Sequence, residues 1–180
     1  MEAQIRSSPD ALREYVETFS RTFGAQIAKR RIYCLTPFPD STLMWSHYAA
    51  NHSGICLEFD VDNPLFRNAR PVRYRSTYPE WALHDIEENI LELVLTKSMD
   101  WAYEREFRLI ASQLTGPLKL HGDFLLLPSG ALTCVIIGCE ADDKAVASII
   151  KIVREHSESL PIKRAVRAPD RYKLIIERAE

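Results

Sequence analysis

Residues 133–166, TCVIIGCEADDKAVASIIKIVREHSESLPIKRAV, decide how this chain is expected to fold. The apolar run Thr133–Ile137 has the length and composition of a strand. Asp142 or Asp143 can cap the helix that follows it, which is expected to run to about residue 156. The apolar residues on its inward face are Val146, Ile149, Ile150 and Val153. A second strand over Ile162–Val166 completes the stretch, so the helix can serve as one crossover within a sheet.

Helices and strands are interspersed along the rest of the chain without a regular alternation. We expect a helix from near Pro9, a short one through Trp45–Asn51 and a long one over Pro79–Lys97. The remaining strand patterns cover residues 30–36, 55–60, 72–75, 107–111, 124–127 and 172–176. These patterns predict a single α+β domain over residues 1–180. Its sheet is expected to be mixed and largely antiparallel and to be packed by helices, in contrast to a doubly wound fold.

The first helix carries an apolar stripe at helical spacing, formed by Leu12, Val16, Phe19, Phe23 and Ile27. A stripe of this kind must face either a core or a partner. We therefore expect the chain to form a homo-oligomer, or to bind a partner chain, through the face from Leu12 to Ile27.

Composition narrows the class of protein. Of the 180 residues, 46% are hydrophobic and 27% are charged, as in ordinary globular proteins, and the net charge of -2 does not indicate a nucleic-acid partner. No apolar run is long enough to span a membrane, and no secretory signal opens the chain. The cysteines lack the spacing of a zinc or redox motif, which favours reduced thiols, a cytoplasmic location and no metal site. These cysteines are Cys34, Cys56, Cys134 and Cys139.

The segment Leu43–Asp60, LMWSHYAANHSGICLEFD, concentrates aromatic, histidine and acidic side chains. On the expected helix, Trp45, Tyr48 and His52 share one face, whereas His47 lies on another. The two histidines are five residues apart, which is not the spacing of a helical metal pair. One of them is expected to be a hydrogen-bonded structural histidine.

The strand that follows is expected to turn Ile55, Leu57 and Phe59 toward the core. Glu58 then leaves that apolar face together with Cys56 and Asp60. A histidine, a tyrosine and a carboxylate can thus meet at one end of the sheet. Such a group can perform acid–base chemistry or bind a ribose.

The segment Lys97–Ile110, KSMDWAYEREFRLI, carries the second concentration of charge. If Glu104 begins an extended stretch, then Glu104, Glu106 and Arg108 point to one side and Phe107 to the other. Lys97 and Trp101 are four residues apart and can share a helical face just before that stretch. We expect the two segments to form two walls of one polar cleft.

These motifs resemble the bacterial family known as domain of unknown function 2971. The resemblance rests on MWSHYAANHSGICLEFD, on a V-x-Y strand at Val72 and Tyr74, and on the late VIIG of Val135–Gly138. It rests equally on a lysine followed by W-x-Y-E-x-E-x-R, which corresponds to Lys97, Trp101, Tyr103, Glu104, Glu106 and Arg108. It extends over about residues 32–138. The family name implies no activity.

Typical members of that family have a longer N-terminal half, with a Y-R pair and a segment rich in Asn, Asp and Pro before the first motif. Neither feature occurs in this chain. The resemblance therefore implies a short or N-terminally truncated member. A site that needs the missing half would have to be completed by another chain.

The candidate site residues divide into two groups. The candidate catalytic residues are His47, Tyr48, Glu58, Glu104 and Glu106, and the candidate cofactor-binding residues are Trp45, Lys97, Trp101 and Arg108. The aromatic residues among them could instead be core anchors, because aromatics at helical spacing usually pack. The charged residues could instead form a structural salt bridge, for example from Arg108 to Glu58 across neighbouring strands.

Three functions remain open. The first is a nucleotide-handling enzyme, with NAD as the implied cofactor and chemistry related to ADP-ribosyl transfer. There Glu104 or Glu106 would stabilise an oxocarbenium charge, and Tyr48 would stack on the nicotinamide. The second is a module in a bacterial defence system, such as phage defence, or in a stress response. It would bind a small anionic ligand or a protein, with Lys97 and Arg108 holding an anionic group. The third is a domain in which the motif residues are architectural.

Overall fold

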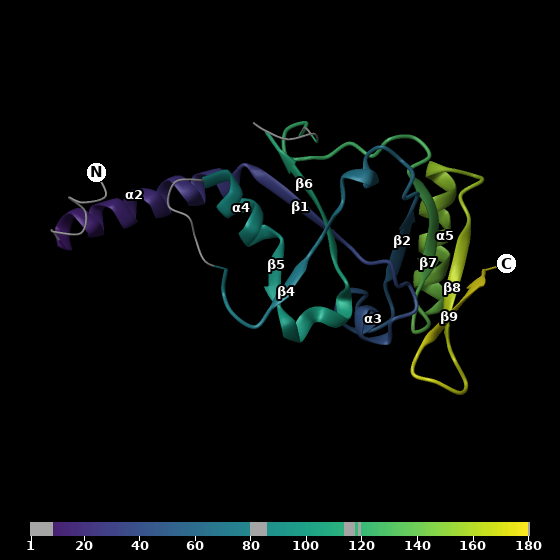
Figure 1. Ribbon diagram of the computed structural model, residues 1–180. Helices are drawn as coiled ribbons and strands as arrows, with labels where there is room; N and C mark the ends of the chain where they lie inside the picture. Colours follow the sequence, from purple (N-terminus) through teal and green to yellow (C-terminus); the bar gives the residue numbers. More distant parts are fainter. Residues whose placement is uncertain (1–8, 80–85, 114–117, 119, 180) are drawn as a thin grey trace. The chain divides into compact units, whose positions relative to one another are not determined.

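The computed structural model describes residues 9–79, 86–113, 118 and 120–179 (Figure 1). Their contacts group into two compact units. The first unit comprises Met1–Cys34, Arg70–Tyr103 and Phe107–Leu126, and the second comprises Leu35–Ala69, Glu104–Glu106 and Leu127–Glu180. The predicted α+β class is confirmed, because helices and mixed sheets occur together. That the two units make up one domain stays a prediction.

The second unit is built on a four-stranded sheet with the order β2-β7-β8-β9. Its strands are β2 (Ile55–Phe59), β7 (Leu132–Ile137), β8 (Ile162–Arg167) and β9 (Leu174–Arg178). Two of the three pairings are antiparallel, and the β7–β8 pairing is parallel. This unit therefore has the mixed, largely antiparallel sheet that the sequence predicts.

The parallel pairing arises from the crossover helix α5 (Asp143–His156), which connects β7 to β8. Asp142 caps this helix by accepting a hydrogen bond from the backbone N–H of Ala145 at 2.7 Å. The inward face of α5 packs on one side of the sheet, against Val135, Ile137 and Ile162 (Figure 1). The predicted strand–helix–strand is thus confirmed, together with its inward residues Val146, Ile149, Ile150 and Val153.

The opposite side of the sheet packs against the short helix α3 (Thr42–Tyr48). Cys134 and Ile136 of β7 point to this side, with Trp45 as the largest residue of the cluster. Because alternate residues of β7 serve two cores, its residues Cys134–Ile137 are all apolar and buried. The 3-10 helix η1 (Phe66–Asn68) follows β2, and its Phe66 stacks on Phe59 with ring centroids 4.6 Å apart.

The predicted inward face of β2 is wrong. Ile55 and Leu57 are exposed, whereas Cys56 packs against the cluster that contains Trp45. The strand lies at the edge of its sheet, and the small cysteine fits beneath the indole. Alternation alone therefore identified the two faces but assigned the wrong one to the core.

In its described residues, the first unit contains two small sheets and two α-helices. One sheet has the order β1-β6-β3, with β1 (Arg30–Leu35), β6 (Phe107–Ser112) and β3 (Arg70–Pro71). The other pairs β4 (Arg73–Arg75) with β5 (Thr96–Ser98) in parallel. The helices are α2 (Pro9–Ala28) and α4 (Ile86–Val94), and the 3-10 helix η2 (Met99–Glu104) continues from β5 into the second unit.

Three predicted elements of this part of the chain differ from those in the structure. The long helix expected over Pro79–Lys97 ends at Val94, and Lys97 lies in β5; its residues 80–85 are outside the described part. The strand expected over residues 124–127 is replaced by a single bridge between His121 and Phe124. The extended stretch expected from Glu104 begins only at Phe107, because Glu104 ends the 3-10 helix η2.

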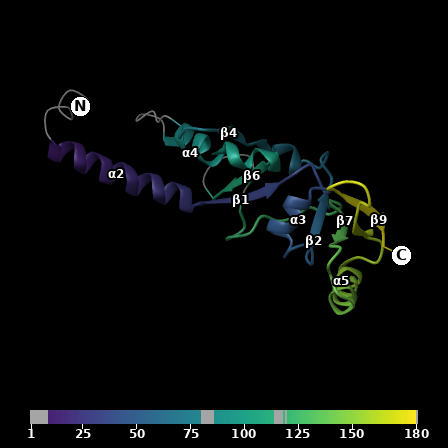
Figure 2. The same ribbon diagram turned by 90° about the horizontal axis from the view of Figure 1, so that it is seen from below.

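The stripe on α2 is only partly covered within its unit. Phe23 and Ile27 pack against Ile90, Val94 and Leu95, whereas Leu12 and Val16 are exposed. In both views the N-terminal part of α2 extends beyond α4 (Figure 2). That a second copy or a partner chain covers this part stays a prediction, which light scattering of the purified protein tests. No helix in the described part of the chain combines the length and apolar character needed to cross a bilayer.

Candidate functional site

The nine residues singled out in the sequence lie in both units. Lys97, Trp101 and Arg108 belong to the first unit. The second unit holds the other six, which are Trp45, His47, Tyr48, Glu58, Glu104 and Glu106. Within the second unit, the structure brings the two sequence motifs together at one contact.

That contact joins Tyr48 to Glu104. The Tyr48 hydroxyl donates a hydrogen bond of 2.7 Å to Oε1 of Glu104. Glu104 is only 2% exposed, whereas Tyr48 is 61% exposed. A buried carboxylate is tolerated only where hydrogen bonds replace its lost hydration. The phenol ring therefore connects a buried acid with the protein surface.

Local structure fixes both sides of this contact. Ser41 caps α3 by accepting from the backbone N–H of Met44, and the indole Nε1 of Trp45 donates to the carbonyl of Pro39 at 2.7 Å. The hydroxyl of Thr36 donates to the carbonyl of Glu104 at 2.8 Å. Trp45 is thus a core anchor, as the alternative interpretation expected, while Tyr48 at the end of the same helix is not.

The residue after Glu104 has an unusual backbone. Arg105 has a φ of 44°, in the left-handed region that non-glycine residues rarely adopt. Its guanidinium lies 5.2 Å from the centroid of the Phe38 ring, within the range of a cation–π contact. This conformation separates the buried Glu104 and Glu106, with the exposed Arg105 between them.

A small apolar hollow lies beside Tyr48. Its volume is about 120 Å³, and its walls include Phe38, Met44, Tyr48 and Ile55. Typical small-molecule pockets measure roughly 300–1,000 Å³. The hollow can therefore enclose one planar ring or one sugar, with the rest of any larger ligand outside it. His47 is exposed, with its ring 6.2 Å from that of Tyr48.

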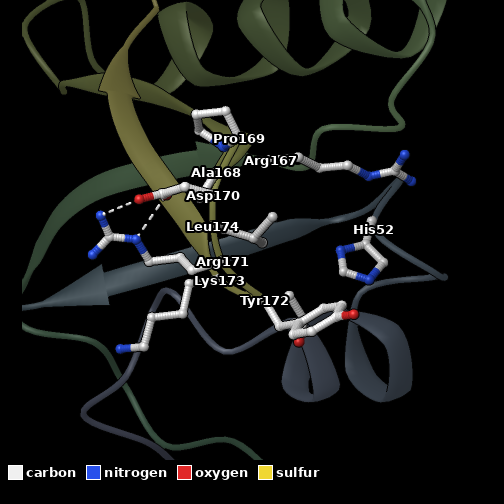
Figure 3. Close-up of a pocket in the computed structure, with 10 residues that line it drawn as sticks. His52, Arg167, Ala168, Pro169, Asp170, Arg171, Tyr172, Lys173 and Leu174 are labelled. Carbon is white, nitrogen blue, oxygen red and sulfur yellow. Dashed lines mark hydrogen bonds and ion pairs between the residues drawn. The ribbon is translucent and has the colours of Figure 1, made fainter.

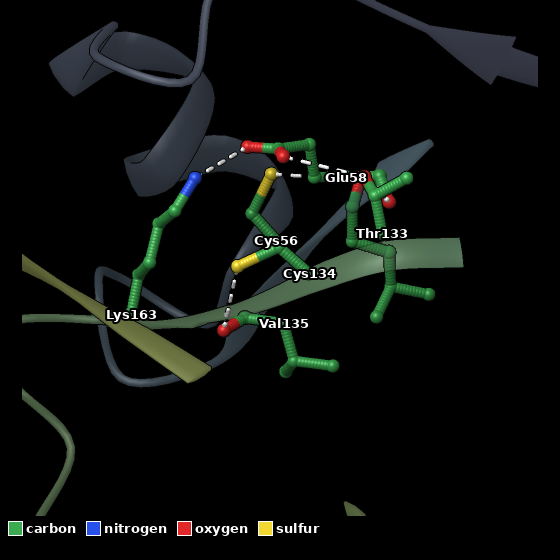
Figure 4. Close-up of polar contacts among 7 residues, drawn as sticks. Cys56, Glu58, Thr133, Cys134, Val135 and Lys163 are labelled. Carbon is green, nitrogen blue, oxygen red and sulfur yellow. Dashed lines mark hydrogen bonds and ion pairs between the residues drawn. The ribbon is translucent and has the colours of Figure 1, made fainter. Parts of the chain in front are cut away.

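Glu58 takes part in a different cluster (Figure 4). It lies on β2, and its carboxylate accepts from Nζ of Lys163 on β8 at 3.0 Å and from the hydroxyl of Thr133 on β7 at 3.3 Å. The alternative pairing with Arg108 is wrong, because β2 pairs with β7 and β6 belongs to another sheet. The bond from Glu58 raises the pKa of Lys163 above its ordinary value.

Two thiols lie beside this ion pair, as Figure 4 shows. Burial raises the pKa of Cys56, and the negative charge of Glu58 raises it further. Burial is also the main reason why the pKa of Cys134 is raised. All four cysteines are free, and Cys34 is exposed. A raised thiol pKa lowers the thiolate fraction, so Cys56 and Cys134 are not activated nucleophiles.

The candidate residues of the first unit form contacts of their own. Nζ of Lys97 lies 4.8 Å from the Trp101 ring centroid, which is a cation–π contact. The predicted proximity of these two residues occurs, although it joins β5 to η2 and not two turns of one helix. Arg108 donates a hydrogen bond to the carbonyl of Val94 at the end of α4. Trp101 is partly exposed and is therefore not a core anchor within this unit.

Sequence reasoning missed a larger hollow in the second unit. It measures about 530 Å³ and is formed by the β8–β9 hairpin together with Thr42 and His52 (Figure 3). The hairpin contributes Arg167, Ala168, Pro169, Asp170, Arg171, Tyr172, Lys173 and Leu174. The available signal was the sequence RAPDRYK, in which a Pro-Asp turn is surrounded by charged residues and an aromatic.

A strained turn places His52 at this hollow. Ala50, Asn51 and His52 all have positive φ, of 47°, 51° and 69°, and they connect α3 to β2. The carbonyl of His52 accepts from the backbone N–H of Glu140 at 3.0 Å. Gly138 is required beneath the turn, because a Cβ atom at that position would lie 2.0 Å from the carbonyl oxygen of His52. Predicted as a member of the helix, His52 instead lies on this turn.

The contact between Tyr48 and Glu104 lies in a segment that matches a known protein family. Residues 44–109 match the model of a family described as "Protein of unknown function (DUF2971)". The match contains Tyr48, His52, Glu58 and Glu104, and it ends before the β8–β9 hairpin and before the VIIG motif. No curated protein and no solved structure matches the chain. Over residues 44–109, this chain is therefore similar to the DUF2971 family of proteins of unknown function.

Proposed function

We propose that the protein binds a small molecule of the nucleotide class at the contact between Tyr48 and Glu104. The observation that carries this proposal is the 2.7 Å hydrogen bond between an exposed phenol and a carboxylate that is 2% exposed. A carboxylate accepts hydrogen bonds from sugar hydroxyls, and a phenol both donates and accepts. Buried polar groups held in this way are typical of binding sites with few polar contacts and an otherwise apolar wall.

The adjacent hollow supports a ligand with a compact ring. Its volume of about 120 Å³ matches one ring or one sugar, and Phe38 and Met44 supply apolar walls. Tyr48 lines the hollow and also bonds Glu104, so a ligand there would meet both an aromatic face and a polar edge. An enzymatic version follows from the same groups. Glu104 or Glu106 would stabilise positive charge developing on a ribose while Tyr48 stacks on the departing nicotinamide ring, as in ADP-ribosyl transfer.

The binding test is calorimetric titration with ADP-ribose and with NAD at millimolar concentrations. We expect binding to the unchanged protein and a loss of about tenfold or more in affinity for Tyr48→Phe and for Glu104→Gln, since each substitution removes one hydrogen bond to the ligand or its positioning group. Tyr78→Phe is the matched control, because Tyr78 is fully exposed and lies in the other unit. Absence of binding by the unchanged protein overturns the proposal.

The enzymatic version is tested by release of nicotinamide from NAD. Glu106→Gln keeps the size of the side chain and removes its charge. Loss of nicotinamide release with an unchanged melting temperature supports catalysis, whereas a large fall in melting temperature assigns Glu106 to the architecture. If the unchanged protein binds ADP-ribose but releases no nicotinamide, the protein is a binding module and not an enzyme of this type.

A non-catalytic structural domain is the second candidate, and one observation favours it. Glu104 is bonded through its carboxylate to Tyr48 and through its carbonyl to Thr36. A residue bonded in this way connects η2 to α3 and to the loop after β1. Under this alternative, Tyr48→Phe and Glu104→Gln lower stability and leave every ligand titration unchanged.

A further inference from the structure

We propose that one face of the β8–β9 hairpin, the hairpin site formed by His52, Arg167 and Tyr172, binds a phosphate-bearing molecule with a planar ring. The site is separate from the contact between Tyr48 and Glu104, and neither proposal depends on the other. Its chemistry is that of a mononucleotide, with the phosphate on the guanidinium and the base on the exposed aromatic ring.

The dimensions of the hollow are the first support. Its volume of about 530 Å³ lies within the range of roughly 300–1,000 Å³ for small-molecule pockets. Figure 3 shows His52, Arg167 and Tyr172 gathered on one side of the hairpin. Asp170, Arg171 and Lys173 lie on its other side. The three residues of the hairpin site therefore share one approach for a ligand.

Arg167 pairs with a carboxylate that a phosphate can displace. Its Nη2 lies 2.9 Å from Oε1 of Glu140, and the two side chains are 72% and 47% exposed. An ion pair in such exposed positions contributes little, because water screens both charges. A phosphate carries more charge than a carboxylate and can accept two parallel hydrogen bonds from a guanidinium. We expect the phosphate to compete with Glu140 for Arg167.

Tyr172 supplies the platform for a ring. The whole residue is 100% exposed, although it lies between two strands that bury their own apolar residues. An exposed aromatic beside a cation is the arrangement with which proteins bind bases, since every base has a face that can stack.

His52, which lies in the segment that matches the family, forms the third part of the hairpin site. Its Nδ1 is buried and has no hydrogen-bond partner among the described residues, whereas buried polar atoms are nearly always paired. The turn that carries it is fixed by the hydrogen bond from the N–H of Glu140 to its carbonyl. The same residue, Glu140, thus positions His52 through its backbone and pairs with Arg167 through its side chain.

The first experiment measures binding of inorganic pyrophosphate and AMP by calorimetry. We expect Arg167→Ala to weaken both ligands by about tenfold, the loss typical of one charge-assisted contact. Tyr172→Ala should weaken AMP by a similar factor and leave pyrophosphate unchanged, because pyrophosphate has no ring. If the unchanged protein binds neither ligand at about 10 mM, the proposal is wrong.

The second experiment removes the competing carboxylate. Glu140→Gln leaves Arg167 without its anion, so we expect AMP to bind several-fold more tightly. Asp170→Asn is the matched control, because it releases Arg171 on the other side of the hairpin. A greater gain from Asp170→Asn than from Glu140→Gln would assign the anion to that other side and overturn the hairpin site.

A control for general charge uses α5. Lys151 is an exposed cation paired with Glu155, like Arg167 with Glu140, but it lies outside the hollow. We expect Lys151→Ala to leave AMP binding unchanged. If it weakens AMP as much as Arg167→Ala does, the interaction is non-specific and the proposal fails. Tyr48→Phe is expected to leave AMP binding at the hairpin site intact, which separates this result from the function proposed above.

Discussion

Glu104 and Glu58 are two carboxylates of the same unit, and both lie in the segment that matches the family. Glu104 is buried and bonded to a tyrosine at the end of a helix. Glu58 is partly exposed and is bonded to Lys163 and Thr133 on neighbouring strands. One acid replaces its hydration with a few fixed bonds, while the other keeps part of its water and pairs with a countercharge.

The difference in burial between the two carboxylates predicts how strongly each contact contributes to stability. Removing a partner from a buried carboxylate leaves a polar atom without hydration, which costs far more than removing one from a solvated pair. We therefore expect the contact between Tyr48 and Glu104 to be sensitive to every change. The cluster around Glu58 should tolerate the same changes.

The largest effect is expected from Glu104→Ala. It removes a fully packed side chain and leaves the Tyr48 hydroxyl without its acceptor, so we expect the free energy of unfolding to fall by about 2–4 kcal/mol. Glu58→Ala removes a solvated ion pair and should cost less than about 1 kcal/mol. Urea unfolding followed by circular dichroism measures both. Equal losses would show that the two carboxylates do not differ as the structure indicates.

Single hydroxyl groups provide the next comparison. Tyr48→Phe removes the hydroxyl that bonds Glu104 and should cost about 1–3 kcal/mol, because an oxygen of a buried acid loses a donor. Thr133→Val removes the hydroxyl that bonds Glu58 and should cost less than about 1.5 kcal/mol. The same urea titrations apply. A larger loss for Thr133→Val would contradict the ranking of the two sites.

The sequence anticipated much of this architecture, for physical reasons that can be stated. The stretch around α5 was predicted nearly to the residue, because its cap, helical period and flanking apolar strands all agree. The motif residues Tyr48 and Glu104 were also both selected. Their meeting in one unit, 56 positions apart in the chain, depends on long-range packing that no local pattern encodes.

The failures have equally specific causes. One alternative paired Glu58 with Arg108 across neighbouring strands, but the neighbour of Glu58 in the sheet comes from β7, more than 70 residues later. Strand order cannot be read from alternation. The inward face of β2 was assigned by apolar character, whereas Trp45 selects the small Cys56. The hollow of the hairpin depends on three residues of positive φ in a segment that looked helical.

A smaller effect is expected from the pH dependence of the Glu58 cluster. The bond from Glu58 raises the pKa of Lys163 in the folded state above its ordinary value of 10.5. A raised pKa means that the stabilisation is complete below 10.5 and is lost as pH rises through the folded value. We therefore expect the stability difference between the unchanged protein and Lys163→Met to be constant near pH 8 and to shrink above pH 10.5.

The control for that series is Lys151→Met, whose ion pair lies on the surface of α5. This lysine is paired with Glu155, so its removal reports the general effect of losing one exposed cation. If the stability difference for Lys163→Met stays flat over the pH range, the bond between Glu58 and Lys163 does not affect stability.

The smallest effect is expected at Cys56. Burial is the main cause of its raised pKa and the charge of Glu58 is the second, so Glu58→Gln removes only the lesser cause. The pKa of Cys56 should fall and its thiolate fraction at pH 8 should rise, with burial still holding that pKa above its ordinary value. Alkylation followed by mass spectrometry measures the rate at Cys56, with the exposed Cys34 as an internal reference. Glu104→Gln should leave that rate unchanged, since Glu104 does not contribute to the pKa of Cys56. An increase with Glu104→Gln would mean that opening the buried contact exposes Cys56, and that the two carboxylates act on one shared region.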